Sequence, residues 1–156
     1  TPIATAGARN ADVLTYPTNL FSGVVGTFYM SSIVSVNAIA NSSILLATFP
    51  ANGGAQMRIQ ASTLGFYDGT ANQTGAAISG SNNLNGLAIA WSGSSASSAV
   101  NGTVVAASGF DGDMSFGANL AVGCATDGTF SLSGTIRRVA YYGARLANAT
   151  LQGLTT

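Results

Sequence analysis

The chain has 156 residues, of which 47% are hydrophobic and only 6% charged, and its five arginines and five aspartates give a formal net charge of zero. This length is usual for one domain, and the apolar fraction is enough for a sizeable core. The sequence has no lysine, glutamate or histidine and one cysteine, Cys124, which excludes a basic nucleic-acid-binding face, the usual zinc, haem and iron–sulfur sites, and histidine-dependent catalytic triads or dyads.

Short β-type segments alternate with turn residues from the start of the chain. Strands are expected in 24–36 and 43–49, and the turn cluster PANGG ends the second. The segments QMRIQAS and LGFYDG then form a predicted hairpin. Alternation in the first of these places Met57 on one face and Arg58 on the other.

The middle of the chain continues this pattern. In LNGLAIAWSG, alternation puts Leu87, Ile89 and Trp91 on one face and two alanines on the other, which predicts a core position for Trp91. Asn101 and Gly102 stand between two apolar runs, and this is the sequence of a two-residue type I′ hairpin.

The last part of the chain completes an all-β prediction. Further strands are expected in 114–124 and 129–142, and Asn148 is expected to cap a short helix formed by ATLQGL. Many short strands with frequent turns indicate a two-sheet antiparallel β-sandwich or jelly roll with one short C-terminal helix. We expect a single domain over 1–156, with 1–10 as an N-terminal arm.

Four motifs also follow one another in a characteristic order: ARNADVLTY, GTFYM, LAIAWSGSSASSAVNGTVVAAS and GTIRRVAYYGARLANATLQGLT. Together they resemble the laminin-G-like, concanavalin A-like jelly-roll domains found at the C-termini of bacteriophage tail-fibre and other virion proteins. In that family an Arg-x-Ala-Asp element opens the domain, here 9–12, and a strand with a Tyr-Tyr pair closes it, here 134–142. The resemblance therefore implies a concanavalin A-like jelly roll.

The closing strand carries two of the five arginines of this weakly charged chain, Arg137 and Arg138. Strict alternation predicts one face made of Ile136, Arg138, Ala140 and Tyr142, and another made of Arg137, Val139 and Tyr141. We expect this strand at the centre of a sheet, with Arg138 paired to Asp12 and arginine stems packed on tyrosine, so that the chain ends are tied together. Asp12, Arg138 and Tyr142 are thus predicted to be structural, and a ligand-binding role for the arginines is the alternative.

Ligand-binding candidates lie in polar turns and loops. Tyr67 and Asp68 could stack on and hydrogen-bond a sugar, and Asn82 and Asn83 lie in a long stretch of small polar residues. Because Phe66 and Tyr67 point to opposite faces, at least one of them is expected in the core. The alternative for the polar stretch is a solvated connection.

Asp111 and Asp113 stand two residues apart around a glycine. With carbonyl and water ligands they could hold Ca²⁺, which takes six to eight oxygen ligands. The alternative is a turn in which aspartate hydrogen-bonds the local backbone. No other cofactor is predicted.

These observations predict a binding module that is not an enzyme. The resemblance implies a virion-surface protein, such as a tail-fibre domain that recognises host glycans, with other virion proteins as partners and a homotrimer as the oligomeric state. The alternatives are a purely structural virion protein without a ligand, and a secreted adhesion module whose four Asn-x-Ser/Thr sequons are used. Neither a signal peptide nor an apolar run of the roughly 18 residues needed to span a bilayer is seen, so no membrane insertion is expected.

Overall fold

A computed structural model describes residues 14–34, 43–48, 54–78 and 83–156. Two helical elements accompany the strands: the short 3-10 helix η1 (Thr18–Leu20) and the C-terminal helix α2 (Asn148–Leu154). The strands are β1 (Leu14–Pro17), β2 (Val25–Val34), β3 (Ser43–Ala47), β4 (Gln56–Gln60), β5 (Thr63–Tyr67), β6 (Asn72–Gln73), β7 (Leu84–Ser92), β8 (Ser95–Val100), β9 (Thr103–Ala106), β10 (Asn119–Val122) and β11 (Gly134–Tyr142).

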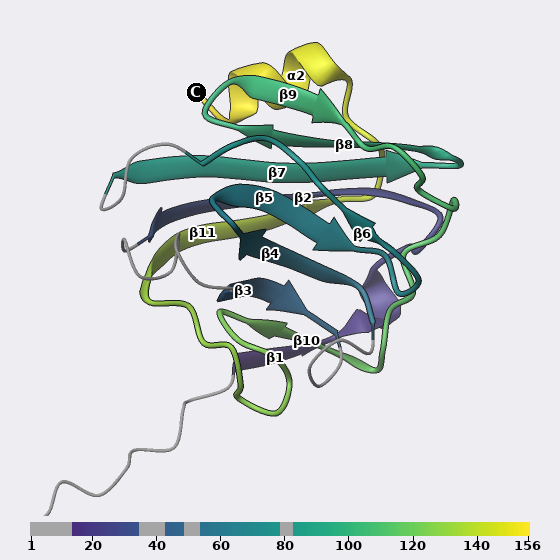
Figure 1. The fold of residues 1–156 in the computed structure, drawn as a ribbon. Coiled ribbons are helices and arrows are strands. Elements are labelled where there is room, and N and C mark those ends of the chain that lie inside the picture. Colours follow the sequence, from purple (N-terminus) through teal and green to yellow (C-terminus); the bar gives the residue numbers. More distant parts are fainter. Residues whose placement is uncertain (1–13, 35–42, 49–53, 79–82) are drawn as a thin grey trace, which may run out of the picture.

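The strands form two antiparallel sheets that pack face to face (Figure 1). One sheet has six strands in the order β1-β10-β3-β4-β5-β6, and the other has five in the order β11-β2-β7-β8-β9. Helix α2 lies beside β8 and β9. The predicted fold class, a two-sheet antiparallel sandwich with one short C-terminal helix, is therefore confirmed. The expected arm at 1–10 lies outside the described residues.

The core between the sheets is built from the faces that alternation predicted. Met57 and Ile59 point into it from β4, and Leu87, Ile89 and Trp91 point into it from β7. Trp91 is 1% exposed, so its predicted core position is confirmed. Its ring packs with other aromatic rings at centroid distances of 5.6 Å (Phe28), 6.0 Å (Phe116) and 6.4 Å (Tyr141).

The Asn101–Gly102 turn joins β8 to β9, as the sequence predicts. Both residues have positive φ, 46° and 80°, which is the requirement of a type I′ turn. Asn101 Oδ1 accepts a hydrogen bond from the Gly86 amide at 2.9 Å, and Asn101 Nδ2 donates to Asn85 Oδ1 at 2.9 Å. The side chain thus fastens the turn to β7.

We expect Asn101→Ala to lower the free energy of unfolding by about 2–3 kcal/mol, measured by urea denaturation. The change removes two hydrogen bonds and forces an alanine into the left-handed region, each of which costs about 1 kcal/mol. Asn101→Gly keeps the backbone freedom and removes only the two hydrogen bonds, so its loss of stability should be about 1 kcal/mol smaller than that of Asn101→Ala. Equal losses for the two variants would contradict this division.

Strand β11 differs from the sequence prediction in two ways. It is an edge strand, paired only with β2, and not a central one. Strict alternation also fails, because a register shift between Ile136 and Arg138 leaves Arg137 as an inserted residue. Ile136 therefore packs on the core together with Val139 and Tyr141.

Some of the structural contacts predicted for Arg138 and Tyr142 are made by other residues or with other partners. Asp12 lies outside the described residues, so its pairing with Arg138 stays a prediction. The Arg138 guanidinium carbon lies 5.9 Å from the centre of the Tyr29 ring, which is a cation–π contact with a tyrosine of β2. Tyr142 is half-buried, whereas its neighbour Tyr141 accepts a hydrogen bond from the Ser22 amide and donates one to the Val25 carbonyl.

The C-terminal segment is fastened over the outer face of the five-stranded sheet. Arg145 donates hydrogen bonds to Ser97 Oγ at 3.0 Å and to Asn148 Oδ1 at 3.2 Å. The predicted capping role of Asn148 is wrong: Ala147 occupies the N-cap position, and no side chain caps the helix. Asn148 is already the first residue of the helix, and its side chain accepts a hydrogen bond from Arg145 instead.

Candidate functional site

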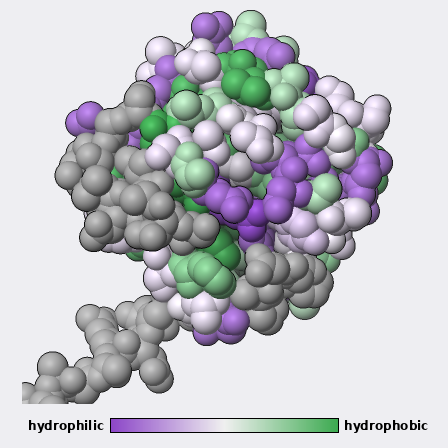
Figure 2. Space-filling view, in the orientation of Figure 1, coloured by the Kyte–Doolittle hydropathy of each residue, from purple (hydrophilic) through white to green (hydrophobic). Residues whose placement is uncertain are grey.

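A cleft of about 430 Å³ lies on the outer face of the six-stranded sheet. We call it the aromatic–polar cleft; its lining residues are Ser43, Ile44, Gln56, Arg58, Gln60, Tyr67, Asn72 and Phe130. In the space-filling view, hydrophilic side chains gather over the middle of this sheet, with hydrophobic surface beside them (Figure 2). The cleft thus combines polar groups with aromatic side chains.

The period of two along β4 supplies the polar side of the cleft. Met57 and Ile59 fill the core, so Gln56, Arg58 and Gln60 face outward. The residue paired with Arg58 on β5 is Gly65. Because glycine has no side chain, β5 places no side chain directly beside Arg58.

Among the residues that the structure describes, Arg58 is the only charged one that lines the cleft. Its Nη2 donates a hydrogen bond to Asn72 Oδ1. Asn72 pairs with Tyr67 in the β5–β6 ladder, so the three side chains share one face of the sheet. Burial lowers the pKa of the Arg58 guanidinium, and the nearby Tyr67 phenol opposes that shift. Arginine remains protonated in spite of such a shift, so the cleft carries a partly desolvated positive charge.

Gln56 is buried at the base of the cleft without hydrogen-bond partners. Its side chain is 1% exposed, and neither its Nε2 nor its Oε1 has a partner among the described residues. A buried amide group without a partner costs about 1–3 kcal/mol. Gln56 therefore holds a donor and an acceptor at the base of the cleft that no described residue uses.

Phe130 adds an exposed aromatic ring to the cleft. It is 46% exposed, and its φ of 53° is unusual for a bulky residue. The Phe130 carbonyl accepts a hydrogen bond from the Ile44 amide at 3.0 Å, which brings the 123–133 loop to β3. Backbone strain of this kind is found at ligand-binding positions in many proteins.

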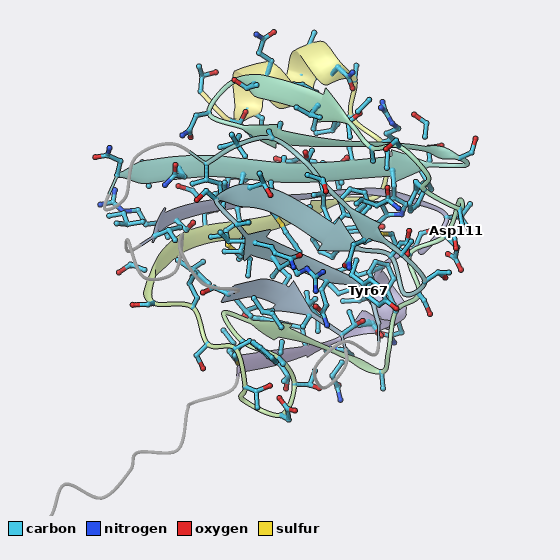
Figure 3. All side chains as sticks on the ribbon, in the orientation of Figure 1. Tyr67 and Asp111 are labelled. Carbon is cyan, nitrogen blue, oxygen red and sulfur yellow. The ribbon has the colours of Figure 1, made fainter. Side chains whose placement is uncertain are left out.

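The structure places the four residues predicted to bind a ligand in different environments. Tyr67 lines the cleft (Figure 3). Asp68 is buried, and its carboxylate accepts hydrogen bonds from the Thr70 and Ala71 amides and from Gln73 Nε2. Asn83 is exposed before β7 and does not line the cleft, and Asn82 lies outside the described residues.

Sequence reasoning missed most of the cleft. Its lining comes from β3, β4, β5, β6 and the loop that carries Phe130, so no single motif contains it. Alternation predicted that Arg58 lies on the face opposite Met57, and a charged residue on one face of a strand in so uncharged a chain was the available signal. Phe130 gave no signal, because its place depends on how the loop folds back over the sheet.

Asp111 and Asp113 lie in a loop, and Asp111 stands apart from Tyr67 at the edge of the molecule (Figure 3). Asp111 Oδ1 accepts a hydrogen bond from the Asp113 amide at 3.3 Å, which is the local backbone bonding of an aspartate turn. The described part of the chain holds no group of three or more histidine, cysteine, aspartate or glutamate side chains that could bind a metal. Two carboxylates are few for Ca²⁺, so calcium binding stays a prediction that rests on carbonyl and water ligands.

The arginine pair of β11 lies in a different part of the surface from the aromatic–polar cleft. Arg137 and Arg138 line a second, mostly apolar cleft of about 570 Å³ that also includes Leu14 and Tyr16 of β1. This cleft lies between the β1 edge of one sheet and the β11 edge of the other. These arginines are therefore not part of the aromatic–polar cleft.

Known structures share this fold. The CBM40 module of the Ruminococcus gnavus IT-sialidase, bound to α2,3-sialyllactose, matches with a TM-score of 0.68 and 17% identity over 94% of each chain. Domain 4 of an extracellular GH43 arabinanase from Geobacillus stearothermophilus, in complex with arabinotriose, matches with a TM-score of 0.69 and 13% identity, over 92% of this chain and 72% of that one. Domains LG4–5 of the mouse laminin α1 chain match with a TM-score of 0.62 and 15% identity, over 89% of this chain and 41% of that one.

Identities this low show the fold alone, which is the jelly-roll sandwich of laminin G and carbohydrate-binding domains. The expected jelly-roll fold is thus confirmed, and the comparison gives no indication of a bacteriophage origin. The sequence matches no protein-family model and no curated protein. Neither described helix is long and apolar enough to cross a bilayer.

Proposed function

We propose that this chain is a non-enzymatic glycan-recognition module and that the aromatic–polar cleft is its binding site. The observation that carries the proposal is the combination of an exposed aromatic ring, Phe130, with outward polar side chains in one cleft of the jelly-roll sheet. Sugars present apolar C–H faces and a ring of hydroxyl groups, so their sites need an aromatic surface and fixed polar partners. Two solved structures of similar fold hold sialyllactose and arabinotriose, which supports this reading.

A role in binding without catalysis fits the residues available. No aspartate is found among the described residues that line the cleft, and the sequence has no glutamate or histidine. Glycoside hydrolysis generally uses a pair of carboxylates flanking the scissile bond. The described lining therefore offers groups that hold a sugar and no carboxylate pair that would cleave one.

A glycan array probed with the purified chain tests the proposal. We expect binding to a subset of glycans and about a tenfold to hundredfold loss of affinity in Phe130→Gly, because the aromatic contact is removed. Glycine suits a φ of 53°, so this variant should keep or raise its melting temperature. Val105→Ala, which shortens an exposed side chain on β9 of the other sheet, is the control and should bind as the original chain does.

The setting of the module is a finer proposal that rests on the motif resemblance. We infer display on the surface of a phage particle, as a homotrimeric tail-fibre or surface domain that contacts other virion proteins and recognises the host envelope. The uncharged composition supports contact between copies, since net charge near zero favours association. A purely structural virion role predicts an array with no bound glycan, and a secreted adhesion module predicts glycosylation at the sequons.

A further inference from the structure

Arg58 is the one cation among the described residues of the aromatic–polar cleft, and it faces no acidic side chain among them. None of the lining residues in the described part of the chain is aspartate. Asp68, which follows Tyr67 in the chain, is buried and uses both carboxylate oxygens to bind Thr70, Ala71 and Gln73. Arg58 makes its one side-chain hydrogen bond among the described residues to a neutral amide, Asn72 Oδ1.

A partly buried guanidinium without an opposing charge is costly. Burial removes water from the charged form, which is the main cause that lowers the Arg58 pKa. A bound anion would offset this cost. The planar guanidinium fork matches the two oxygens of a carboxylate, and such pairs are directional as well as strong.

The side-chain amide of Gln56, near Arg58, can recognise uncharged groups of the same ligand. Gln56 lies two residues from Arg58 on the same face of β4, and both of its side-chain polar atoms lack partners in the described part of the chain. A sugar hydroxyl can donate to Oε1 and accept from Nε2. A ligand with a carboxylate beside hydroxyl groups would therefore meet both unsatisfied features of the cleft.

The dimensions and the apolar groups of the cleft fit the same ligand. Its volume of about 430 Å³ falls in the range of small-molecule sites. Tyr67 and Phe130 offer aromatic surface against which the C–H face of a sugar ring can pack.

We propose that the aromatic–polar cleft selects sugars that bear a carboxylate, with Arg58 binding the carboxylate and Gln56 binding a hydroxyl group beside it. This inference rests on the proposed function and names the ligand class of that site. Uronic acids and sialic acids share this chemistry, and the experiment separates them.

Calorimetric titration of the full chain with matched probes tests the inference. The probes are trigalacturonic acid and sialyllactose, each compared with its own methyl ester, which keeps the rings and removes the charge. We expect at least one acid to bind about tenfold to hundredfold more tightly than its ester, with the difference shrinking at high salt. The acid that binds identifies the source of the carboxylate.

Substitution of Arg58 tests whether this residue is responsible for the preference for the acid over its ester. Arg58→Gln should reduce the acid-to-ester ratio to about threefold or less, because the charge-assisted bonds are lost. Arg137→Gln is the matched control: it removes the same charge from an exposed position on β11, outside the cleft, and should leave the ratio unchanged. An ester that binds as tightly as its acid, or an Arg58→Gln variant with an unchanged ratio, would overturn the proposal.

A second variant keeps the test valid if Arg58→Gln fails to fold. Gln56→Leu replaces a buried amide without partners by an apolar side chain, so it should raise the melting temperature while weakening binding of the acidic probe. A more stable variant that binds the acid with full affinity would count against the role of Gln56. Neutral glycans bound on the array without any preference for acids would refute this inference and leave the proposed function standing, whereas an array without bound glycans would refute both.

Discussion

Trp91→Ala should lower the free energy of unfolding by about 3–5 kcal/mol, the usual cost of truncating a large buried aromatic side chain. The ring is 1% exposed and packs against Phe28, Phe116 and Tyr141. Gly26, the residue paired with Trp91, shows how tightly the site is filled, because a Cβ placed there would lie 2.7 Å from the Trp91 ring. The tightly packed neighbouring residues therefore cannot easily move into the cavity that Trp91→Ala would leave.

Urea denaturation followed by far-ultraviolet circular dichroism measures this loss. Trp91→Phe is the informative control, since it keeps an aromatic ring and also removes an indole N–H that has no partner among the described residues. We expect the phenylalanine variant to lose clearly less stability than the alanine variant. A loss below about 1 kcal/mol for Trp91→Ala would mean that this ring is not packed as described.

Leu151→Ala is expected to cost about 2–5 kcal/mol and to release the C-terminal helix. Leu151 is fully buried against Ala88, Ala90 and Ala99 on the outer face of the five-stranded sheet. Helix α2 has only seven residues and no side-chain cap, so it depends on this contact for stability. The small alanines of β7 and β8 allow the helix to lie close to the sheet.

Hydrogen exchange at the Gly102 amide reports on the same contact. This amide donates to Thr155 Oγ1 at 3.0 Å, so it should exchange faster once the segment detaches. Gln152→Ala changes an exposed side chain of the same helix and should leave both stability and exchange nearly unchanged. Slow exchange at Gly102 in Leu151→Ala would show that the segment is held without Leu151.

Features that depend on a few neighbouring residues were determined by the sequence itself. Alternation identified the core faces of β4 and β7, including Trp91, because side chains of a strand point to opposite faces with a period of two. Asn101–Gly102 specified its hairpin, because few other residues accept positive φ at both turn positions. Frequent turns with little helix were enough to indicate a two-sheet sandwich.

Only the tertiary structure decided which distant segments meet. The register shift at Arg137 and the edge position of β11 follow from pairing with β2, about a hundred residues earlier in the chain, so strict alternation within the strand misplaced Ile136. The predicted cap at Asn148 was wrong because the helix already begins at Asn148, so the N-cap position falls on Ala147 and the Asn148 side chain binds Arg145 instead. The aromatic–polar cleft also depends on contacts between distant segments. The alternation of β4 alone places Arg58 on the face opposite Met57, but Phe130 reaches the cleft through the 123–133 loop. The local sequence does not determine the path of this loop, because that path depends on pairing and packing across the whole sheet.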